Sequence, residues 1–294
     1  MVESSTHDGS CLCGTVRYQV TGPFHTMMSC HCSMCRKHHG APFGTYVSSK
    51  MDGFRWLAGE DSILAYESSG QGKRYSCKVC GSVLPMMMPE HGLAVCPSGP
   101  LEGDLGITPK AHLFVGSKAP WYTITDSLPQ HEEYPPEYSA QGIPRPQVEA
   151  KPGVTPGSCL CGDVAFEVTG DALFMWNCHC QRCRRARSAA HNTNIFYRPA
   201  QFRWTRGESQ VVDYKLPEAR FYGVAFCKRC GGSVPRASIE RGIVVVPAGC
   251  LDADPGARPN GHIYTNHKAS WFEITDSVPQ HPEAPPPPPE PRPS

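Results

Sequence analysis

The residues of this sequence best suited to chemistry are its cysteines. The chain of 294 residues contains 16 cysteines, most of them in short blocks spaced as Cys-x-Cys or Cys-x-x-Cys. Cysteines this close in sequence rarely form unstrained disulfides with each other, whereas the same spacings bring several thiolates to one metal ion. We therefore interpret the blocks as ligand sets for Zn²⁺ and not as a disulfide framework.

Each block occurs twice in the same order, which indicates an internal duplication. GSCLCG begins at Gly9 and again at Gly157, 148 residues later, and CHCSMCR at Cys30 is matched by CHCQRCR at Cys178. CKVCG and CKRCG follow at a separation of 150 residues. A repeat that keeps order and spacing predicts two tandem copies of one domain. The expected division is a first domain at 8–138, a linker at 139–156, a second domain at 157–281 and a Pro-rich tail at 282–294.

Composition limits the partners that we expect. The formal net charge of +1 gives no long-range field that would attract nucleic acid or an anionic membrane surface. The sequence shows no signal peptide pattern and no apolar run near the roughly 18 residues of a membrane span. We expect a soluble, cytoplasmic protein with neither nucleic acid nor membrane as a partner. The Pro-rich tail is typical of a solvated polyproline II segment, with a ligand for an SH3-type or WW-type domain as the less favoured alternative.

Short apolar segments between turn residues predict a mostly β fold. Segments 15–20 and 163–168 alternate apolar and polar residues with period two, as half-buried strands do. Segments 92–95 and 242–246 are short apolar runs suited to buried strands. Long helical periodicity is absent, and 28 Gly and 30 Pro indicate many loops. Each copy is therefore expected to be mainly antiparallel sheet, with bound metal supplementing a modest core.

The seven block cysteines of each copy divide into four plus three. The two outer pairs of a copy would form a closed four-thiolate zinc site, the usual structural arrangement, in which the glycine after Cys-x-x-Cys supplies the backbone angle. The closed sets are Cys11, Cys13, Cys77 and Cys80 in the first copy and Cys159, Cys161, Cys227 and Cys230 in the second. The remaining triplets are Cys30, Cys32 and Cys35 in the first copy and Cys178, Cys180 and Cys183 in the second.

A second Zn²⁺ held by a triplet would keep one coordination position open, which is the catalytic pattern. Three thiolates overneutralise the ion, so it should activate water poorly and suit a soft ligand such as a substrate thiolate. The alternative is that the triplet belongs to the scaffold, with His31 or a remote residue as the fourth ligand. Because His31 and His179 each lie between two ligands on an extended segment, we expect both to face away from the metal.

Several other residues have a weaker claim to function. Cys96 and Cys250 do not align between the copies and are expected to be buried core thiols. Arg36 and Arg184, which follow the triplets, could lower thiolate pKa values, bind an anionic substrate, or lie on the solvated surface. For the following recurring pairs, packing is favoured over lining a substrate pocket: His112 with His262, Lys118 with Lys268, and Trp121 with Trp271.

Taken together, these motifs resemble the glutathione-dependent formaldehyde-activating enzyme family, which also includes centromere protein V. The stretches that carry the resemblance are GSCLCG, CHCSMCRKHHGAPF (Cys30 to Phe43), RYSCKVCGS (Arg74 to Ser82) and KAPWYTITDSLPQ (Lys118 to Gln130). The resemblance covers both copies. It implies two tandem β-tent domains, each with a structural zinc on the outer four cysteines and a catalytic zinc on the triplet. It also implies the addition of glutathione to formaldehyde, which gives S-hydroxymethylglutathione.

The copies differ after the triplet, where the first reads RKHHGAPF and the second reads RRARSAAHNTNIF. The first copy keeps the family pattern, so we expect Cys30, Cys32 and Cys35 to be catalytic. The favoured hypothesis is a zinc-dependent carbon–sulfur lyase, with two zinc ions per domain, acting on an adduct of glutathione or a similar thiol with a small aldehyde or other electrophile. The alternatives are a zinc-stabilised binding module without catalysis and a family member repurposed for a biosynthetic small molecule.

Overall fold

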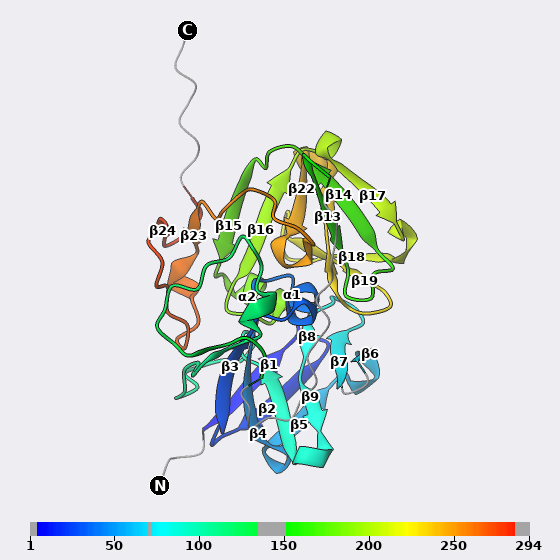
Figure 1. The fold of residues 1–294 in the computed structure, drawn as a ribbon. Helices are drawn as coiled ribbons and strands as arrows, with labels where there is room; N and C mark the ends of the chain where they lie inside the picture. The colour runs from blue at the N-terminus through cyan, green and yellow to red at the C-terminus, as the bar shows by residue number, and fades with distance from the viewer. Residues whose placement is uncertain (1–4, 70–71, 135–150, 286–294) are drawn as a thin grey trace.

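The chain folds into two similar halves built mainly from β strands (Figure 1). This computed structural model describes residues 5–69, 72–134 and 151–285. The strands of the first half are β1 (Thr6–Ser10), β2 (Arg17–Thr21), β3 (Thr26–Cys30), β4 (Gly44–Lys50), β5 (Phe54–Ala58), β6 (Ile63–Ser69), β7 (Gly72–Cys77), β8 (Val83–Leu84), β9 (Met86–Met88), β10 (Leu93–Pro97), β11 (His112–Leu113) and β12 (Gln130–His131). Helix α1 (Ser33–His39) follows β3.

The second half repeats this order of elements. Its strands are β13 (Val154–Ser158), β14 (Ala165–Thr169), β15 (Phe174–Cys178), β16 (Asn192–Tyr197), β17 (Phe202–Arg206), β18 (Val211–Lys215), β19 (Gly223–Cys227), β20 (Ser233–Val234), β21 (Arg236–Ser238), β22 (Ile243–Pro247), β23 (Gly261–Ile263) and β24 (Gln280–His281). Helix α2 (Gln181–Arg187) follows β15, as α1 follows β3.

Each half contains the same set of sheets. In the first half the strand orders are β1-β2-β5, β12-β11-β3-β4-β10-β9 and β6-β7-β8. In the second half they are β13-β14-β17, β21-β22-β16-β15-β23-β24 and β18-β19-β20. The pairings are antiparallel except those of β11 with β3 and β12, and those of β23 with β15 and β24. The mostly antiparallel β architecture in two tandem copies that the sequence predicts is confirmed.

The apolar segments singled out in the sequence form strands. Segments 15–20 and 163–168 correspond to β2 and β14, and the runs at 92–95 and 242–246 correspond to β10 and β22. In β2 the side chains of Tyr18 and Val20 are fully buried, whereas Gln19 between them is only partly buried. This alternation is the one that a strand with a single buried face requires.

Strand β13 begins inside the segment expected to be a linker. Val154 pairs with Thr169, which starts the first hairpin of the second half. Pro156 favoured the linker interpretation, but β13 is the edge strand of its sheet, and an edge strand tolerates a residue without a backbone donor. Residues 135–150 and 286–294, which carry most of the expected linker and of the Pro-rich tail, lie outside the described residues.

The two halves pack against each other with approximate two-fold symmetry. In Figure 1 the first half lies below, the second half lies above, and α1 and α2 lie between them. Thr125 and Thr275 occupy equivalent positions in the two copies, and their Oγ1 atoms are 2.5 Å apart. His39 of α1 and Arg187 of α2 are also equivalent, and His39 Nδ1 lies 2.6 Å from the carbonyl oxygen of Arg187. Contacts between equivalent residues place both pairs close to the symmetry axis.

Backbone segments meet directly at this interface. A Cβ atom on Gly249 would clash with the backbone of Ala41 in the first half, and a Cβ atom on Gly99 would clash with the backbone of Ala189 in the second half. Gly99 and Gly249 are equivalent, as are Ala41 and Ala189, so the same close approach occurs twice. A side chain at either glycine would force the halves apart, because the neighbouring atoms belong to the backbone and cannot rotate away.

Aromatic rings fill the centre of the interface. The ring of Phe43 lies 5.4 Å from that of Tyr122 and 5.9 Å from that of His191, and the ring of Phe272 lies 5.4 Å from that of His191. His191 occupies in the second half the position that Phe43 occupies in the first, and it is buried. Burial first, and the neighbouring His262 second, lower the pKa of His191 to about 3.

The buried His191 should make the folded state sensitive to acid. Because its pKa is about 3 when folded and about 6.5 when unfolded, the unfolded chain binds one more proton between these values, and stability falls as the pH falls through this window. The variant His191→Phe copies the residue of the first half and removes this proton. Between pH 6 and pH 5 the unfolding free energy of the variant should fall by about 1.2 kcal/mol less than that of the wild type. Urea unfolding at each pH, with zinc content recorded, checks this, and equal slopes for the two proteins would contradict it.

Candidate metal centres

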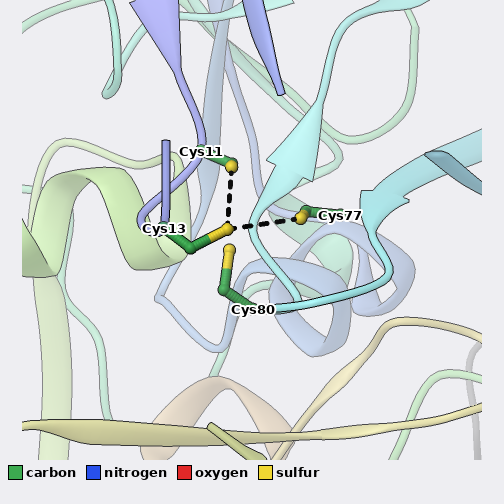
Figure 2. Close-up of side chains that lie close together, drawn as sticks. All are labelled: Cys11, Cys13, Cys77 and Cys80. Atoms are coloured by element: carbon green, nitrogen blue, oxygen red, sulfur yellow. Dashed lines mark hydrogen bonds between the residues drawn. The ribbon is translucent and has the colours of Figure 1, made fainter. Parts of the chain in front are cut away.

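The outer cysteine pairs of each half come together in one cluster. Figure 2 shows Cys11, Cys13, Cys77 and Cys80 with their sulfur atoms pointing toward one another. Cys13 Sγ lies 3.4 Å from Cys11 Sγ and 3.8 Å from Cys77 Sγ. The second half forms the same cluster from Cys159, Cys161, Cys227 and Cys230. These are the two sets of four that the sequence spacing predicts.

Turns at both ends of the cluster present the thiolates. Cys11 lies in the turn after β1, where Val16 donates its backbone N–H to Cys11 Sγ at 3.3 Å. Cys77 ends β7, and the glycine after Cys80, Gly81, has a φ of 71° that closes the second turn. Ser82 Oγ accepts the N–H of Leu12 and ties the two turns together. The first-half cluster therefore joins segments about 65 residues apart in sequence, and Cys80 is almost fully buried.

The triplets form two further clusters. Cys30 ends β3, Cys32 caps the N-terminus of α1, and Cys35 lies in the first turn of the helix. The N–H of Cys35 donates to Cys32 Sγ at 3.3 Å, and the corresponding distance between Cys183 and Cys180 in the second half is 3.5 Å. Within the described residues, no histidine, carboxylate or further cysteine joins either set of three.

All four clusters fit a zinc ion. In each, every pair of sulfur atoms lies within 4.8 Å. Tetrahedral coordination with Zn–S bonds of about 2.3 Å requires sulfur atoms about 3.8 Å apart, whereas a disulfide requires about 2.05 Å. In the two four-cysteine clusters, sulfur separations of 3.4 to 3.8 Å lie near the first value, and all the cysteines are free thiols. The donor sets could therefore hold two ions in each half.

A guanidinium group donates to the first triplet. Arg74 of β7 lies with its two Nη atoms 3.6 and 3.7 Å from Cys35 Sγ, and it is partly buried. Burial alone would lower the pKa of Arg74, but the negative charge of Cys35 reverses this effect and raises it. The arginine therefore stays charged and stabilises negative charge on the triplet.

Tyr46 and His39 complete the surroundings of Cys35. Tyr46 Oη lies 3.6 Å from Cys35 Sγ and 2.6 Å from His39 Nε2. The carbonyl of Arg187 can only accept, so His39 must carry its proton on Nδ1. Burial lowers the pKa of His39 to about 4, so the ring is neutral near pH 7 and its Nε2 accepts the proton of Tyr46. Arg74, and not Tyr46, is therefore the charged donor to Cys35.

The second triplet has different neighbours. Val224 stands in place of Arg74, and Tyr222 Oη lies 3.6 Å from Cys183 Sγ. Arg187 stands in place of His39, and its buried guanidinium donates to Ser233 Oγ at 2.5 Å. Burial lowers the pKa of Arg187, while the charges of nearby thiol and phenol groups act in the opposite direction. Each triplet thus has a second arginine nearby, but the two arginines come from different elements.

The arginines that follow the triplets are not solvated surface residues. Arg36 is 8% exposed, and its Nε and Nη1 atoms have no hydrogen-bond partner within the described structure. Burial lowers the pKa of Arg36, and the nearby Cys32 and Asp252 counteract this effect. Arg184 is partly buried and donates from Nη1 to the carbonyl of Gly99 at 3.1 Å.

A buried chain of histidines supports the segment between the ligands of each triplet. Asp126 can only accept from His112 Nε2 at 3.0 Å, so His112 Nδ1 accepts from His31 Nε2 at 2.8 Å. His179, His262 and Asp276 repeat these contacts in the second half. The structure thus places His31 and His179 against a second histidine and outside the sulfur clusters.

The remaining recurring residues also have positions that explain them. Trp121 and Trp271 are buried, and Lys118 donates from Nζ to the carbonyl of Tyr122 at 2.5 Å. Cys96 and Cys250 are fully buried. Sequence reasoning missed Arg74, Tyr46 and His39. Arg74 could have been found by comparing the two copies, because arginine lies three residues before Cys77 and valine lies three residues before Cys227.

The fold and the sites define a duplicated β protein with two metal-type cysteine clusters in each half. The chain belongs to the glutathione-dependent formaldehyde-activating enzyme family, whose sequence pattern matches residues 6–117 and again 154–267. The expected family and its tandem duplication are therefore confirmed. No helix in the described part of the chain has the length and apolar character to cross a membrane.

Individual proteins similar to this chain are known. A Halomonas elongata protein named "Putative glutathione-dependent formaldehyde-activating enzyme" is 32% identical over 125 residues, which are 40% of this chain and 80% of that protein. A crystal structure of a Rhodobacter sphaeroides protein shares 24% identity and covers 35% of this chain and 97% of its own, with a TM-score of 0.29.

Proposed function

We propose that the protein is a zinc-dependent carbon–sulfur lyase that joins glutathione, or a similar thiol, to formaldehyde or another small aldehyde at the triplet Cys30, Cys32 and Cys35. The observation that carries this proposal is a set of three converging sulfur atoms that no fourth ligand of the described chain completes. Membership of the family implies glutathione and formaldehyde as substrates. In the reaction a carbon–sulfur bond forms, and the carbonyl oxygen becomes a hydroxyl that carries the former thiol proton.

The charges around the first triplet favour an anionic ligand. Three thiolates and one Zn²⁺ sum to a charge of −1, and the partly buried Arg74 and the buried Arg36 add two positive charges. The sum is therefore +1, and a substrate thiolate would neutralise it in a site from which water is largely excluded. Zn²⁺ bound there would supply Lewis-acid stabilisation of the thiolate sulfur. The two arginines would hold the same negative charge electrostatically while the aldehyde approaches.

Zinc X-ray absorption tests the proposal directly. Titration of the zinc protein with glutathione should add sulfur to the zinc shell, because the open position takes up the substrate thiolate. Cys32→Ala serves as the control, since it removes a ligand of the first triplet and should weaken this change. If the number of sulfur ligands per zinc stayed unchanged at saturating glutathione, the proposal would be wrong.

Arg74 should matter more to turnover than Tyr46. Arg74→Met removes a charge-assisted hydrogen bond to Cys35, which contributes about 1.5–3 kcal/mol, so kcat/KM should fall about 10–100-fold. Tyr46→Phe should change it by less than about threefold, because the phenol donates to His39 and not to Cys35. Steady-state rates with glutathione and formaldehyde compare the two. Equal losses would show that the assignment of donors around Cys35 is wrong.

A further inference from the structure

A cavity of about 340 Å³ lies between the two halves, and no cysteine of the sulfur clusters is among its lining residues. The first half contributes the segment 99–103, and the second half contributes one face of α2 and the segment 268–271. On α2 the lining residues are Gln181, Arg184 and Arg185, whose spacing puts them on one side of the helix. Cys183 lies on another side of the same helix, so the cavity is distinct from the second triplet.

The charges that line this cavity do not cancel. Arg185 forms an ion pair with Glu102. Arg184 donates to the carbonyl of Gly99, and Lys268 donates to the carbonyls of Ala269 and Phe272. Among the described residues no carboxylate lies within ion-pair distance of Arg184 or Lys268. Carbonyl groups satisfy hydrogen bonds but do not neutralise a charge, so the three cations and Glu102 leave the lining with a net charge of +2, and the nearby Cys180 also acts on Arg184.

The equivalent place on the other side of the two-fold axis holds a buried ion pair. There Lys37, the equivalent of Arg185, forms an ion pair with Asp252, and both side chains are only 7% exposed. Lys37 Nζ also donates to Ser158 Oγ at 2.6 Å and to the carbonyl of Ser158 at 3.0 Å. On the side with the cavity, Glu102 stands in place of Asp252, and the side chain of Glu102 is 53% exposed. The interface thus has the buried Lys37–Asp252 ion pair on one side of the two-fold axis and a charged cavity on the other.

We propose that this cavity binds a small dianionic oxyanion, such as a dicarboxylate or a phosphate group. The guanidinium of Arg184 offers further N–H donors in the planar arrangement that suits carboxylate and phosphate oxygens, and Lys268 offers a second positive charge across the cavity. The volume lies near the lower end for ligand pockets, which limits the occupant to a small metabolite. Both halves contribute lining residues, so neither half forms the site alone. The proposal does not depend on the reaction at the first triplet.

Calorimetric titration of the zinc-loaded full chain at low ionic strength tests the site, with inorganic phosphate and succinate as separate probes. At least one probe should bind with one-to-one stoichiometry, and the preferred probe identifies the chemical class. Arg184→Met and Lys268→Met should each weaken binding about 10-fold or more, because each removes a charge-assisted contact. Lys118→Met is the matched control, since Lys118 is the equivalent of Lys268 and does not line the cavity. It should leave binding unchanged.

A variant at an exposed position keeps the test decisive if the other replacements disturb folding. Glu102→Gln removes the negative charge that lines the cavity, so it should tighten binding of the same probe several-fold. Binding of neither probe to the wild type up to about 10 mM would overturn the proposal. It would also be overturned if Glu102→Gln failed to tighten binding, or if the folded Arg184 and Lys268 variants bound as tightly as the wild type.

Discussion

Replacing Cys80 by serine should remove one zinc ion from the chain and destabilise both halves together. Cys80 belongs to the first closed cluster, and the same hydrophobic core contains Leu216, Ala219 and Val224 of the second half. A Cβ atom on Gly81, the next residue, would clash with the ring of Phe226. Loss of the ion would therefore loosen a turn against which the second half packs.

The expected size of this effect follows from the affinity of structural zinc. Binding free energies of about 10–16 kcal/mol, divided among four thiolates, assign about 2.5–4 kcal/mol to each ligand. For a chain of 294 residues that loss lowers the melting temperature by about 4–7 °C. Scanning calorimetry should show the whole transition moving, and elemental analysis should show one zinc fewer per chain.

Cys96→Ser is a matched control for this prediction. Cys96 is fully buried in β10 and belongs to none of the clusters, so the same replacement introduces the same hydroxyl without removing a ligand. It should cost about 1–3 kcal/mol for burying a polar group and leave the zinc content unchanged. If Cys80→Ser lost zinc but a second-half transition stayed at its wild-type temperature, the halves would be thermally independent and the shared core would not couple them.

Local spacing was enough to predict the cysteine triplets and pairs, and the usual four-thiolate zinc site then predicted which distant pairs join. The cysteines of each triplet, and of each pair in the four-cysteine sets, lie two or three residues apart, and thiolates at that spacing have few ways to point except toward one ion. The period-two alternation that buries Tyr18 and Val20 is equally local, and it predicted β2. Features of this kind need no knowledge of the rest of the chain.

The interface could not be predicted in this way, because its contacts join residues with no local signal. His39 next to the triplet looks like any residue at the end of a short helix, yet its proton position is set by a carbonyl of Arg187, 148 residues away. Gly99 and Gly249 belong to no recognisable sequence motif, although at each of them the backbone of the other half leaves no room for a side chain. Comparison of the two copies does give information about contacts between residues that are distant in sequence. Where Arg74 is replaced by Val224, His39 is replaced by Arg187, and the cation moves from one element to another.

The largest effect on activity is expected from the first triplet. Cys32→Ala should lower the zinc content by one ion and reduce turnover of glutathione and formaldehyde by at least about 100-fold, equivalent to about 2.7 kcal/mol of transition-state stabilisation. Cys180→Ala at the equivalent position should also lose one ion but keep most of the activity. The physical reason is that Arg74 stabilises negative charge on Cys35, whereas Val224 in the second half donates nothing to Cys183.

The two replacements form a matched pair, because Cys32 and Cys180 both cap the N-terminus of the helix that follows their strand. Any loss that comes from the cap alone should therefore be shared, and the difference between the variants reports catalysis. Zinc analysis should give four ions for the wild type and three for each variant, if every cluster of the described chain is filled. Selective inactivation by Cys180→Ala would move the reaction to the second half, where Cys180 is less buried than Cys32, and would leave Arg74 with a structural role.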